Sequence, residues 1–199
     1  MRDATEYFNQ QAANYAGASG RFPWSWLRAR ERSAVLKVMG PLPRAEVLEL
    51  GCGAGYYTRV LLQEGAAHVW AVDRAQEMLS QLPPDPRITP IEGDAATVRV
   101  GRTFPVVAAL GVFEFVDAID VLRSAAAHAD PRAWLVVLFS LQSVPGMLIR
   151  GFHASHGVEA RLYSLRHFEH AARAAGWQLE ANRKAGLFGM AARFRRVPA

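Results

Sequence analysis

The chain has 199 residues, of which 51% are hydrophobic and 21% are charged, and its formal net charge is +5 at pH 7. These values are ordinary for one soluble globular domain. Cys52 is the single cysteine, which excludes an intrachain disulfide and a clustered-cysteine metal site and favours a reducing cytoplasm. The longest apolar runs are too short to cross a bilayer.

The N-terminal 40 residues are rich in aromatic side chains, and residues 21–37 favour a helix. Trp24, Leu27, Ala34, Val35 and Val38 fall roughly on one side of this helix, although Glu31 interrupts that side. Two interpretations stay open. The apolar side packs against the rest of the protein, or it contacts a membrane surface.

The central segment alternates strand-like and helix-like stretches. Five short apolar runs predict strands at residues 45–50, 68–73, 87–94, 104–111 and 134–140. Periodic stretches between them predict helices at residues 55–65, 75–82 and 117–129, the last capped by Asp117. Near-continuous apolar strands separated by helices indicate a parallel sheet covered on both faces.

The last third has a different pattern. Residues 141–163 form a long connection without clear periodicity, as is typical of lids and binding loops, and this connection contains His153 and His156. Residues 164–176 have a Ser cap, helical spacing and a Gly stop, and two strand-like stretches around "AGLFG" predict a terminal antiparallel pair.

Three glycines follow the first predicted strand in "VLELGCGAG". Gly51, Gly53 and Gly55 lie at the turn where parallel sheets bind ligands, and glycine leaves no Cβ between the backbone and a ligand. Asp73 ends the second strand about 20 residues later, where a carboxylate can accept hydrogen bonds from ribose hydroxyls. The spacing predicts a nucleotide-like ligand, and a glycine turn that serves only packing is the alternative.

A dinucleotide site would make similar demands on the sequence. Its glycine pattern is G-x-G-x-x-G, whereas this chain has G-C-G-A-G followed by Tyr56. Glu49, just before the turn, would repel a pyrophosphate and suit a ligand that carries an ammonium group. These features disfavour a nicotinamide oxidoreductase.

The stretches "VLELGCGAG", "AVDRAQEML", "IEGDA" and "ALGVFEFV" occur in this order between residues 45 and 140. They resemble the successive motifs of class I S-adenosylmethionine-dependent methyltransferases. The resemblance implies an α/β fold with a Rossmann-like, seven-stranded, mostly parallel sheet, helices on both faces and an antiparallel last strand. It divides the single domain, residues 1–199, into an N-terminal helical lid (1–40), a cofactor-binding core (41–140), a substrate lid segment (141–163) and a terminal helix and hairpin (164–199).

The same resemblance implies a set of residues that bind S-adenosylmethionine. The methionine part would contact Glu49, Gly51, Gly53, Gly55 and, at its carboxylate end, Tyr15. Asp73 would hold the ribose hydroxyls, with Arg74 and Met78 near the adenosine. Asp94 would accept from the adenine amino group, with Ala95 beside it, and Leu110 and Gly111 would line the floor of the cofactor site. Simpler roles stay open for some of them: a turn cap for Asp94, core packing for Met78 and Tyr15, and a surface position for Arg74.

The cofactor carries the reactive methyl group, so the protein mainly aligns the reactants. A hydroxyl or amine acceptor can still need a base, and His153 and His156 are the candidates, with ordinary surface histidines as the alternative. His153, His156 and His167 lack a nearby acidic pair or cysteine, so we expect no metal site.

We expect a small, aromatic or apolar acceptor methylated at oxygen or nitrogen. A lipid or quinone at the membrane surface and a non-catalytic S-adenosylmethionine-binding protein are the alternatives. No nucleic acid partner is expected, because "LGVFEFV" lacks the Asp/Asn-Pro-Pro-aromatic motif of enzymes that methylate DNA amino groups and the basic "RFRR" suits an edge strand. The sequence leaves the acceptor and the oligomeric state open.

Overall fold

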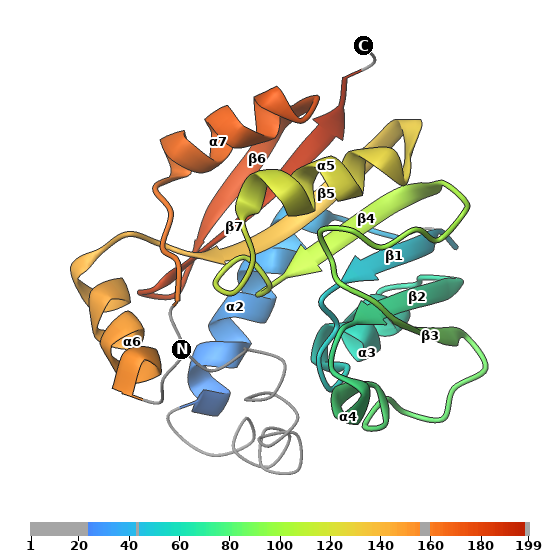
Figure 1. The fold of residues 1–199 in the computed structure, drawn as a ribbon, viewed down its shortest axis with the longest axis horizontal. Helices are drawn as coiled ribbons and strands as arrows, with labels where there is room; N and C mark the ends of the chain where they lie inside the picture. Colours follow the sequence, from blue (N-terminus) through green and yellow to red (C-terminus); the bar gives the residue numbers. More distant parts are fainter. Residues whose placement is uncertain (1–23, 43, 156–159, 198–199) are drawn as a thin grey trace.

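The protein is described by a computed structural model that covers residues 24–42, 44–155 and 160–197 (Figure 1). A seven-stranded sheet has the order β3-β2-β1-β4-β5-β7-β6. The strands are β1 (Glu46–Leu50), β2 (His68–Asp73), β3 (Ile88–Glu92), β4 (Phe104–Leu110), β5 (Ala129–Ser140), β6 (Trp177–Ala185) and β7 (Gly189–Arg196). Strands β1 to β5 pair in parallel, and β7 runs antiparallel to both β5 and β6. The predicted fold class is therefore confirmed.

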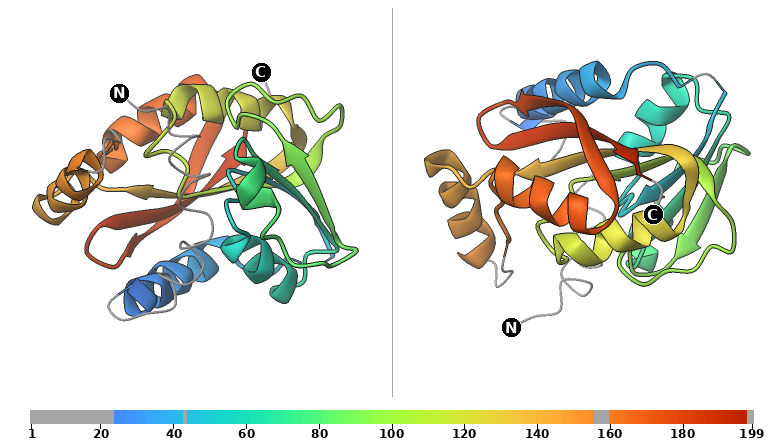
Figure 2. Two further views of the ribbon diagram at one scale, coloured as in Figure 1. Left: turned by 60° about the horizontal axis from the view of Figure 1, so that its bottom comes forward. Right: turned by 90° about the horizontal axis from the view of Figure 1, so that it is seen from above.

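Helices cover both faces of this sheet (Figures 1 and 2). The helices of the described residues are α2 (Trp24–Met39), α3 (Tyr56–Gln63), α4 (Gln76–Leu79), α5 (Ala118–Ala127), α6 (Val144–Ser155) and α7 (Leu165–Ala174), of which α6 lies outside the two layers. Because successive strand residues point to opposite faces, Val107 and Ala109 of β4 pack on the α5 and α7 side, while Val106 and Ala108 join α2 and α3. The sheet is thus buried on both faces, as its continuous apolar strands predict.

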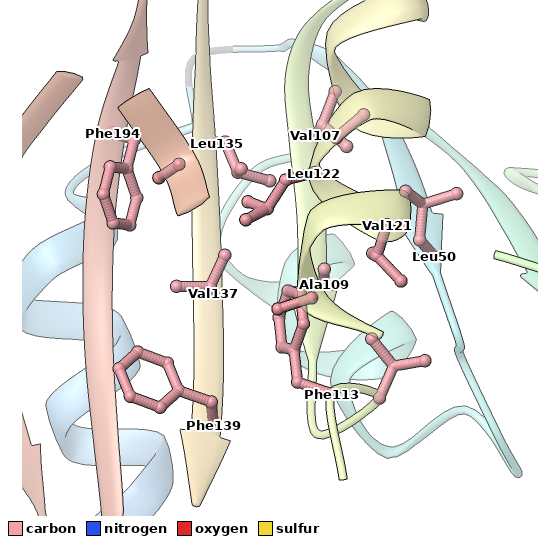
Figure 3. Close-up of a cluster of buried hydrophobic side chains, with 14 of the residues drawn as sticks. Leu50, Val107, Ala109, Phe113, Val121, Leu122, Leu135, Val137, Phe139 and Phe194 are labelled. Carbon is pink, nitrogen blue, oxygen red and sulfur yellow. The ribbon is translucent and has the colours of Figure 1, made fainter. Parts of the chain in front are cut away.

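Aromatic rings join the C-terminal elements to the central sheet, and Figure 3 shows three of them, Phe113, Phe139 and Phe194, in one buried cluster. Phe168 of α7 stacks on Phe139 of β5 with ring centroids 4.1 Å apart, and it meets Phe113 edge to face at 4.8 Å. The Trp177 indole nitrogen donates a 3.0 Å hydrogen bond to the carbonyl of Leu122 in α5. This packing fixes the C-terminal elements against the segment that follows β4.

Two predicted helices have the caps expected from the sequence. Asp117 accepts a hydrogen bond from the Ile119 amide at 3.1 Å at the start of α5, and Ser164 accepts one from the His167 amide at 3.1 Å at the start of α7. The predicted helix at 75–82 is shorter than expected, because α4 ends at Leu79. The Gln81 and Leu82 amides bond three residues back and Pro83 follows, so the helix tightens and stops.

The connection at residues 141–163 contains a helix that the sequence pattern did not predict. Helix α6 lies beyond the carboxyl end of β5, outside the two helical layers (Figures 1 and 2). The Ser143 hydroxyl accepts a 3.1 Å hydrogen bond from the Gly146 amide at its start. Pro145, Gly146 and Gly151 obscure the helical pattern in the sequence, because proline and glycine are poor helix formers.

The apolar side of α2 faces the sheet. Leu27, Ala34, Val35 and Val38 are all buried, the last three in the cluster with α3 and the sheet. Protein therefore already covers these four side chains, which favours the packing interpretation of this side. Within the described residues, the model contains no helix with the length and apolar character needed to span a bilayer.

Candidate active site

The glycine turn after β1 lies against the end of β2. Gly51, Gly53 and Gly55 all have positive φ angles, of 77°, 51° and 78°. The Gly51 and Cys52 amides donate to the carbonyl of Val72 at 2.8 and 2.9 Å, and the Gly53 amide donates to Asp73 Oδ2 at 2.8 Å. The turn is therefore fixed to β2 by three hydrogen bonds at the edge where parallel sheets bind ligands.

The glycines do not all have the same role. A Cβ added at Gly51 would lie 2.6 Å from Val112, and one at Gly55 would lie 2.6 Å from Leu82, so these two positions are required by protein packing. A Cβ added at Gly53 or at Gly111 would meet no atom within 4 Å. Gly53 and Gly111 thus border open space at the carboxyl ends of β1 and β4, where a ligand can approach the backbone.

The Asp73 carboxylate is held in one orientation beside this space. Its Oδ1 accepts from the Ala75 amide at 2.9 Å, and its Oδ2 accepts from the Gly53 amide at 2.8 Å. Each carboxylate oxygen can accept a further hydrogen bond. The residues at this edge therefore fit a ligand with two adjacent hydroxyl groups, such as a ribose.

Glu49 lies in β1, two residues before Gly51. It is 1% exposed, and Thr58 donates a 2.6 Å hydrogen bond to its Oε2. Burial raises the pKa of Glu49 to about 8, the Thr58 hydrogen bond opposes this rise, and the nearby Asp73 adds to it. A buried carboxyl group of this kind favours a cationic partner, because a positive charge would offset the cost of ionising it.

The other predicted residues have partners in the protein. Arg74 lies 3.8 Å from Asp94 as an ion pair, and Asp94 Oδ1 accepts from the Ala96 amide at 2.8 Å, so Asp94 does cap a turn. Met78 is 2% exposed and packs with Ala75 and Ala54. Ala95 and Leu110 are buried in the two main apolar clusters.

The structure tests the role of neither predicted catalytic histidine. His153 lies on α6, and His156 lies outside the described residues, as does Tyr15. Among the residues that the structure describes, no group of three His, Cys, Asp or Glu side chains is arranged to hold a metal ion.

A second polar group at this edge was not predicted from the sequence. Glu31 of α2 interacts electrostatically with Arg28 of the same helix and with Glu114 of the segment after β4, and Tyr57 of α3 interacts with Arg28 and Glu31. Burial raises the pKa of Glu31 to about 7, with Arg28 opposing and Glu114 adding to the rise, and burial also raises the pKa of Glu114. One signal was available, since Glu114 is a single charge within the aromatic stretch "GVFEFV".

Comparison with known proteins agrees with this geometry. Residues 47–132 match a family model described as a methyltransferase domain. A tRNA U34 carboxymethyltransferase of Shewanella denitrificans is 36% identical over 61 residues, which are 31% of this chain and 17% of that protein. The chain thus matches about a sixth of the length of this curated relative.

Solved structures match over almost the whole chain. A magnesium protoporphyrin IX methyltransferase from Synechocystis, with bound S-adenosylhomocysteine (SAH), has a TM-score of 0.77 and 19% identity over 97% of this chain and 98% of that one. A chain from the complex of the Haloferax volcanii Trm112 methyltransferase activator with a methyltransferase has a TM-score of 0.81 and 14% identity over 100% of both chains. At these identities the likeness establishes the fold.

Proposed function

We propose that this chain transfers a methyl group from S-adenosylmethionine to an oxygen or nitrogen of a small molecule. Its residues 47–132 match the methyltransferase domain model, and its fold is like that of solved methyltransferases. The observation that carries the proposal is the open space bordered by Gly53, Gly111 and the fixed Asp73 carboxylate. A nucleoside needs this combination of close backbone approach and paired acceptors.

When bound, S-adenosylmethionine supplies a methyl group on a positively charged sulfur. Asp73 would hold the ribose hydroxyls, and Glu49 with the turn at Gly51, Gly53 and Gly55 would surround the methionine part. Tyr15 is proposed for the carboxylate end of that part. The adenosine would lie near Arg74, Met78, Asp94 and Ala95, and Leu110 and Gly111 would line the floor of the cofactor site. These residues orient the donor, and the acceptor must then reach it from the opposite side in line.

His153 and His156 are proposed as bases for a hydroxyl or amine acceptor, since both belong to the segment proposed as a substrate lid, residues 141–163. Replacing each histidine with Ala separately tests the role as a base, and normal turnover of both variants would remove the two histidines from consideration. Residues 1–40 are proposed as the N-terminal lid.

The acceptor is proposed to be a small aromatic or apolar molecule. The likeness to an enzyme named for magnesium protoporphyrin IX, at 19% identity, is in keeping with such an acceptor. RNA is the second candidate, because the relative named for tRNA modification is 36% identical over 61 residues and the chain has a net charge of +5. The lipid or quinone alternative loses the support it drew from the apolar side of α2.

A cytoplasmic location is proposed because Cys52 is the only cysteine.

Transfer of a labelled methyl group tests the proposal. The protein and S-adenosylmethionine with a labelled methyl group are incubated with a small-molecule library and, separately, with purified tRNA. Label in a small molecule supports the proposal, and label only in tRNA favours the second candidate. Cofactor binding without transfer to either acceptor class would favour the non-catalytic alternative.

A further inference from the structure

Four large apolar side chains are exposed at one end of the molecule. Trp26 of α2 is 45% exposed, and Leu187, between β6 and β7, is 61% exposed. Val144 and Met147 of α6 are 72% and 51% exposed. The start of α2, the β6–β7 turn and α6 lie at this end in every view of Figures 1 and 2. These four side chains, the exposed apolar group, are separate from the buried side of α2 and indicate a binding surface.

Direct contacts join the three segments that carry this group. A Cβ added at Gly186, in the β6–β7 turn, would lie 3.2 Å from Leu27 Cδ1, so the turn packs on the start of α2. The Leu141 amide donates a 2.6 Å hydrogen bond to the carbonyl of Phe188, which joins the turn to the residues before α6. A Cβ added at Gly146 would lie 2.1 Å from the Leu141 carbonyl oxygen, so α6 begins against the same residue. The three segments therefore form one continuous end of the molecule.

On both helices, an exposed basic side chain accompanies the exposed apolar one. Arg30 follows Trp26 by one turn of α2, and its guanidinium lies 4.3 Å from the centroid of the Trp26 ring. Arg150 follows Met147 by three residues on α6, so the two share one side of that helix. An arginine side chain has an apolar stem and a charged end, which suits a boundary between apolar and aqueous surroundings.

The β6–β7 hairpin repeats this combination, and its charge has the same sign. Lys184 lies three residues before Leu187, beside Arg183, and both basic side chains are exposed. No Asp or Glu occurs in the stretches that form this end of the molecule, residues 24–30, 141–154 and 181–189. The acid that follows on α2, Glu31, already pairs with Arg28. Positive charge therefore surrounds the exposed apolar group.

This combination of aliphatic and basic side chains distinguishes between the partners of such a surface. RNA would use the positive charge but would leave Val144, Met147 and Leu187 beside phosphate groups. A second copy of the chain would bring like charges together, which is unfavourable. A bilayer surface with anionic headgroups suits both kinds of side chain, because apolar residues enter the interface while lysine and arginine stay at the headgroups.

We propose that the exposed apolar group and the basic side chains around it dock the protein on an anionic membrane surface. This goes beyond the proposed function, since docking does not depend on which acceptor is methylated. Its consequence for the reaction rests on the proposed function. Ser140 pairs with Gly189 at the carboxyl end of β5, so the docked end belongs to the same edge of the sheet as the glycine turn. An apolar acceptor dissolved in the bilayer would then lie close to the cofactor site.

Vesicle flotation tests docking without any acceptor or cofactor. The full chain is mixed with vesicles of phosphatidylcholine alone, or of phosphatidylcholine and phosphatidylglycerol in equal parts, over a range of lipid concentrations. The wild type should bind the anionic vesicles at least about tenfold more tightly than the neutral ones, and added salt should weaken this binding.

Two double variants identify the side chains that dock. Met147→Ser with Leu187→Ser should weaken binding to anionic vesicles by about tenfold. Val197→Ser is the matched control, because Val197 is 41% exposed but follows β7 at the opposite edge of the sheet. Arg150→Gln with Lys184→Gln should remove most of the preference for anionic vesicles, whereas Arg123→Gln, at an exposed position on α5, should keep it.

Several outcomes would overturn the inference. One is equal binding by the wild type and the apolar double variant, and another is equal binding to neutral and anionic vesicles. Binding of tRNA but not of vesicles, weakened in that variant, would assign the surface to RNA. A dimer that the variant dissociates, without vesicle binding, would assign it to a second copy.

Calorimetry with SAH keeps the proposed function separate from this inference. If SAH binds and anionic vesicles do not, the membrane surface is wrong and the cofactor site stands. If anionic vesicles bind as described and SAH does not, the proposed function fails and the membrane surface stands.

Discussion

The Gly53 amide donates a 2.8 Å hydrogen bond to Oδ2 of Asp73, a residue 20 positions farther along the chain. This contact ties the glycine turn after β1 to the carboxylate that ends β2. It holds the two features that a nucleoside needs, an uncovered backbone and a fixed pair of acceptor oxygens, in one place. The contact depends on a backbone conformation that glycine adopts without strain.

Replacing Gly53 with Ala should therefore abolish SAH binding with only a modest loss of stability. The new Cβ meets no protein atom within 4 Å, so it projects into the space proposed for the ligand. A residue other than glycine at this positive φ costs about 1–2 kcal/mol of stability. Gly101→Ala is the matched control, because Gly101 also has positive φ and no neighbour within 4 Å but lies outside the site. Calorimetry should show binding to Gly101→Ala, and equal affinities for both variants would contradict the site.

Glu49 should make the unliganded protein less stable as the pH rises. Its pKa is raised by burial from 4.5 to about 8, so between these values the unfolded chain loses a proton that the folded protein keeps. The free energy of unfolding then falls with pH, by up to about 1.4 kcal/mol per pH unit for this group.

Chemical denaturation at several pH values checks this. Glu49→Gln removes the titrating group and keeps the side-chain shape, so its stability relative to the wild type should grow from pH 5 to pH 8 and then level off. Glu31 and Glu114 titrate in both proteins, so the difference isolates Glu49. A stability difference that does not change with pH would show that Glu49 does not titrate in this range.

Much of the fold follows from local sequence signals. The limits of β2 are those predicted, because "HVWAVD" is a continuous apolar strand between glycine-rich and helical stretches. β5 begins five residues earlier than its predicted limit of 134, since the pairing of Phe104 with Ala129 precedes a register shift that accommodates Asp130 and Pro131. Irregular strand pairing of this kind leaves no periodic pattern in the sequence from which it could be predicted.

The candidate site, like the fold, could be predicted from the sequence only in part. The turn at Gly51 and the acid at Asp73 belong to one β-α-β unit, so their spacing predicts their meeting. Glu31 and Glu114 come from segments far apart in the chain and meet only when α2 packs on the sheet. In the sequence, Glu31 was no more than an interruption of an apolar side. The electrostatic interaction between Glu31 and Glu114 could be identified only from the folded structure.

The two capped helices allow a test of local stability. Asp117→Ala and Ser164→Ala each remove a side-chain acceptor for a first-turn amide, of Ile119 and His167. Each should lower the free energy of unfolding by about 1 kcal/mol. Arg123→Ala, at an exposed position inside α5, should change it by less than about 0.5 kcal/mol. Denaturant titrations check this, and an equal loss in all three variants would argue against the caps.

Phe168 should be one of the most sensitive positions in the core. It is fully buried, and it contacts Phe139 and Phe113 on either side. Phe168→Ala should lower the free energy of unfolding by about 3–5 kcal/mol, because it leaves a cavity between α7 and the sheet. Phe168→Leu, which fills part of that space, should cost less. A small loss in the Ala variant would mean that α7 does not pack as described.

The most direct test of the central claim is calorimetric titration of the purified protein with SAH, with the wild type beside Asp73→Ala. Asp85→Ala, at an exposed turn where Asp85 pairs with Arg87, serves as the control. The wild type and Asp85→Ala should bind SAH with similar affinity, and Asp73→Ala should bind at least about tenfold more weakly, because it loses the acceptors for the ribose hydroxyls. Equal binding by Asp73→Ala and the wild type, or no binding by the wild type, would contradict the proposed cofactor site.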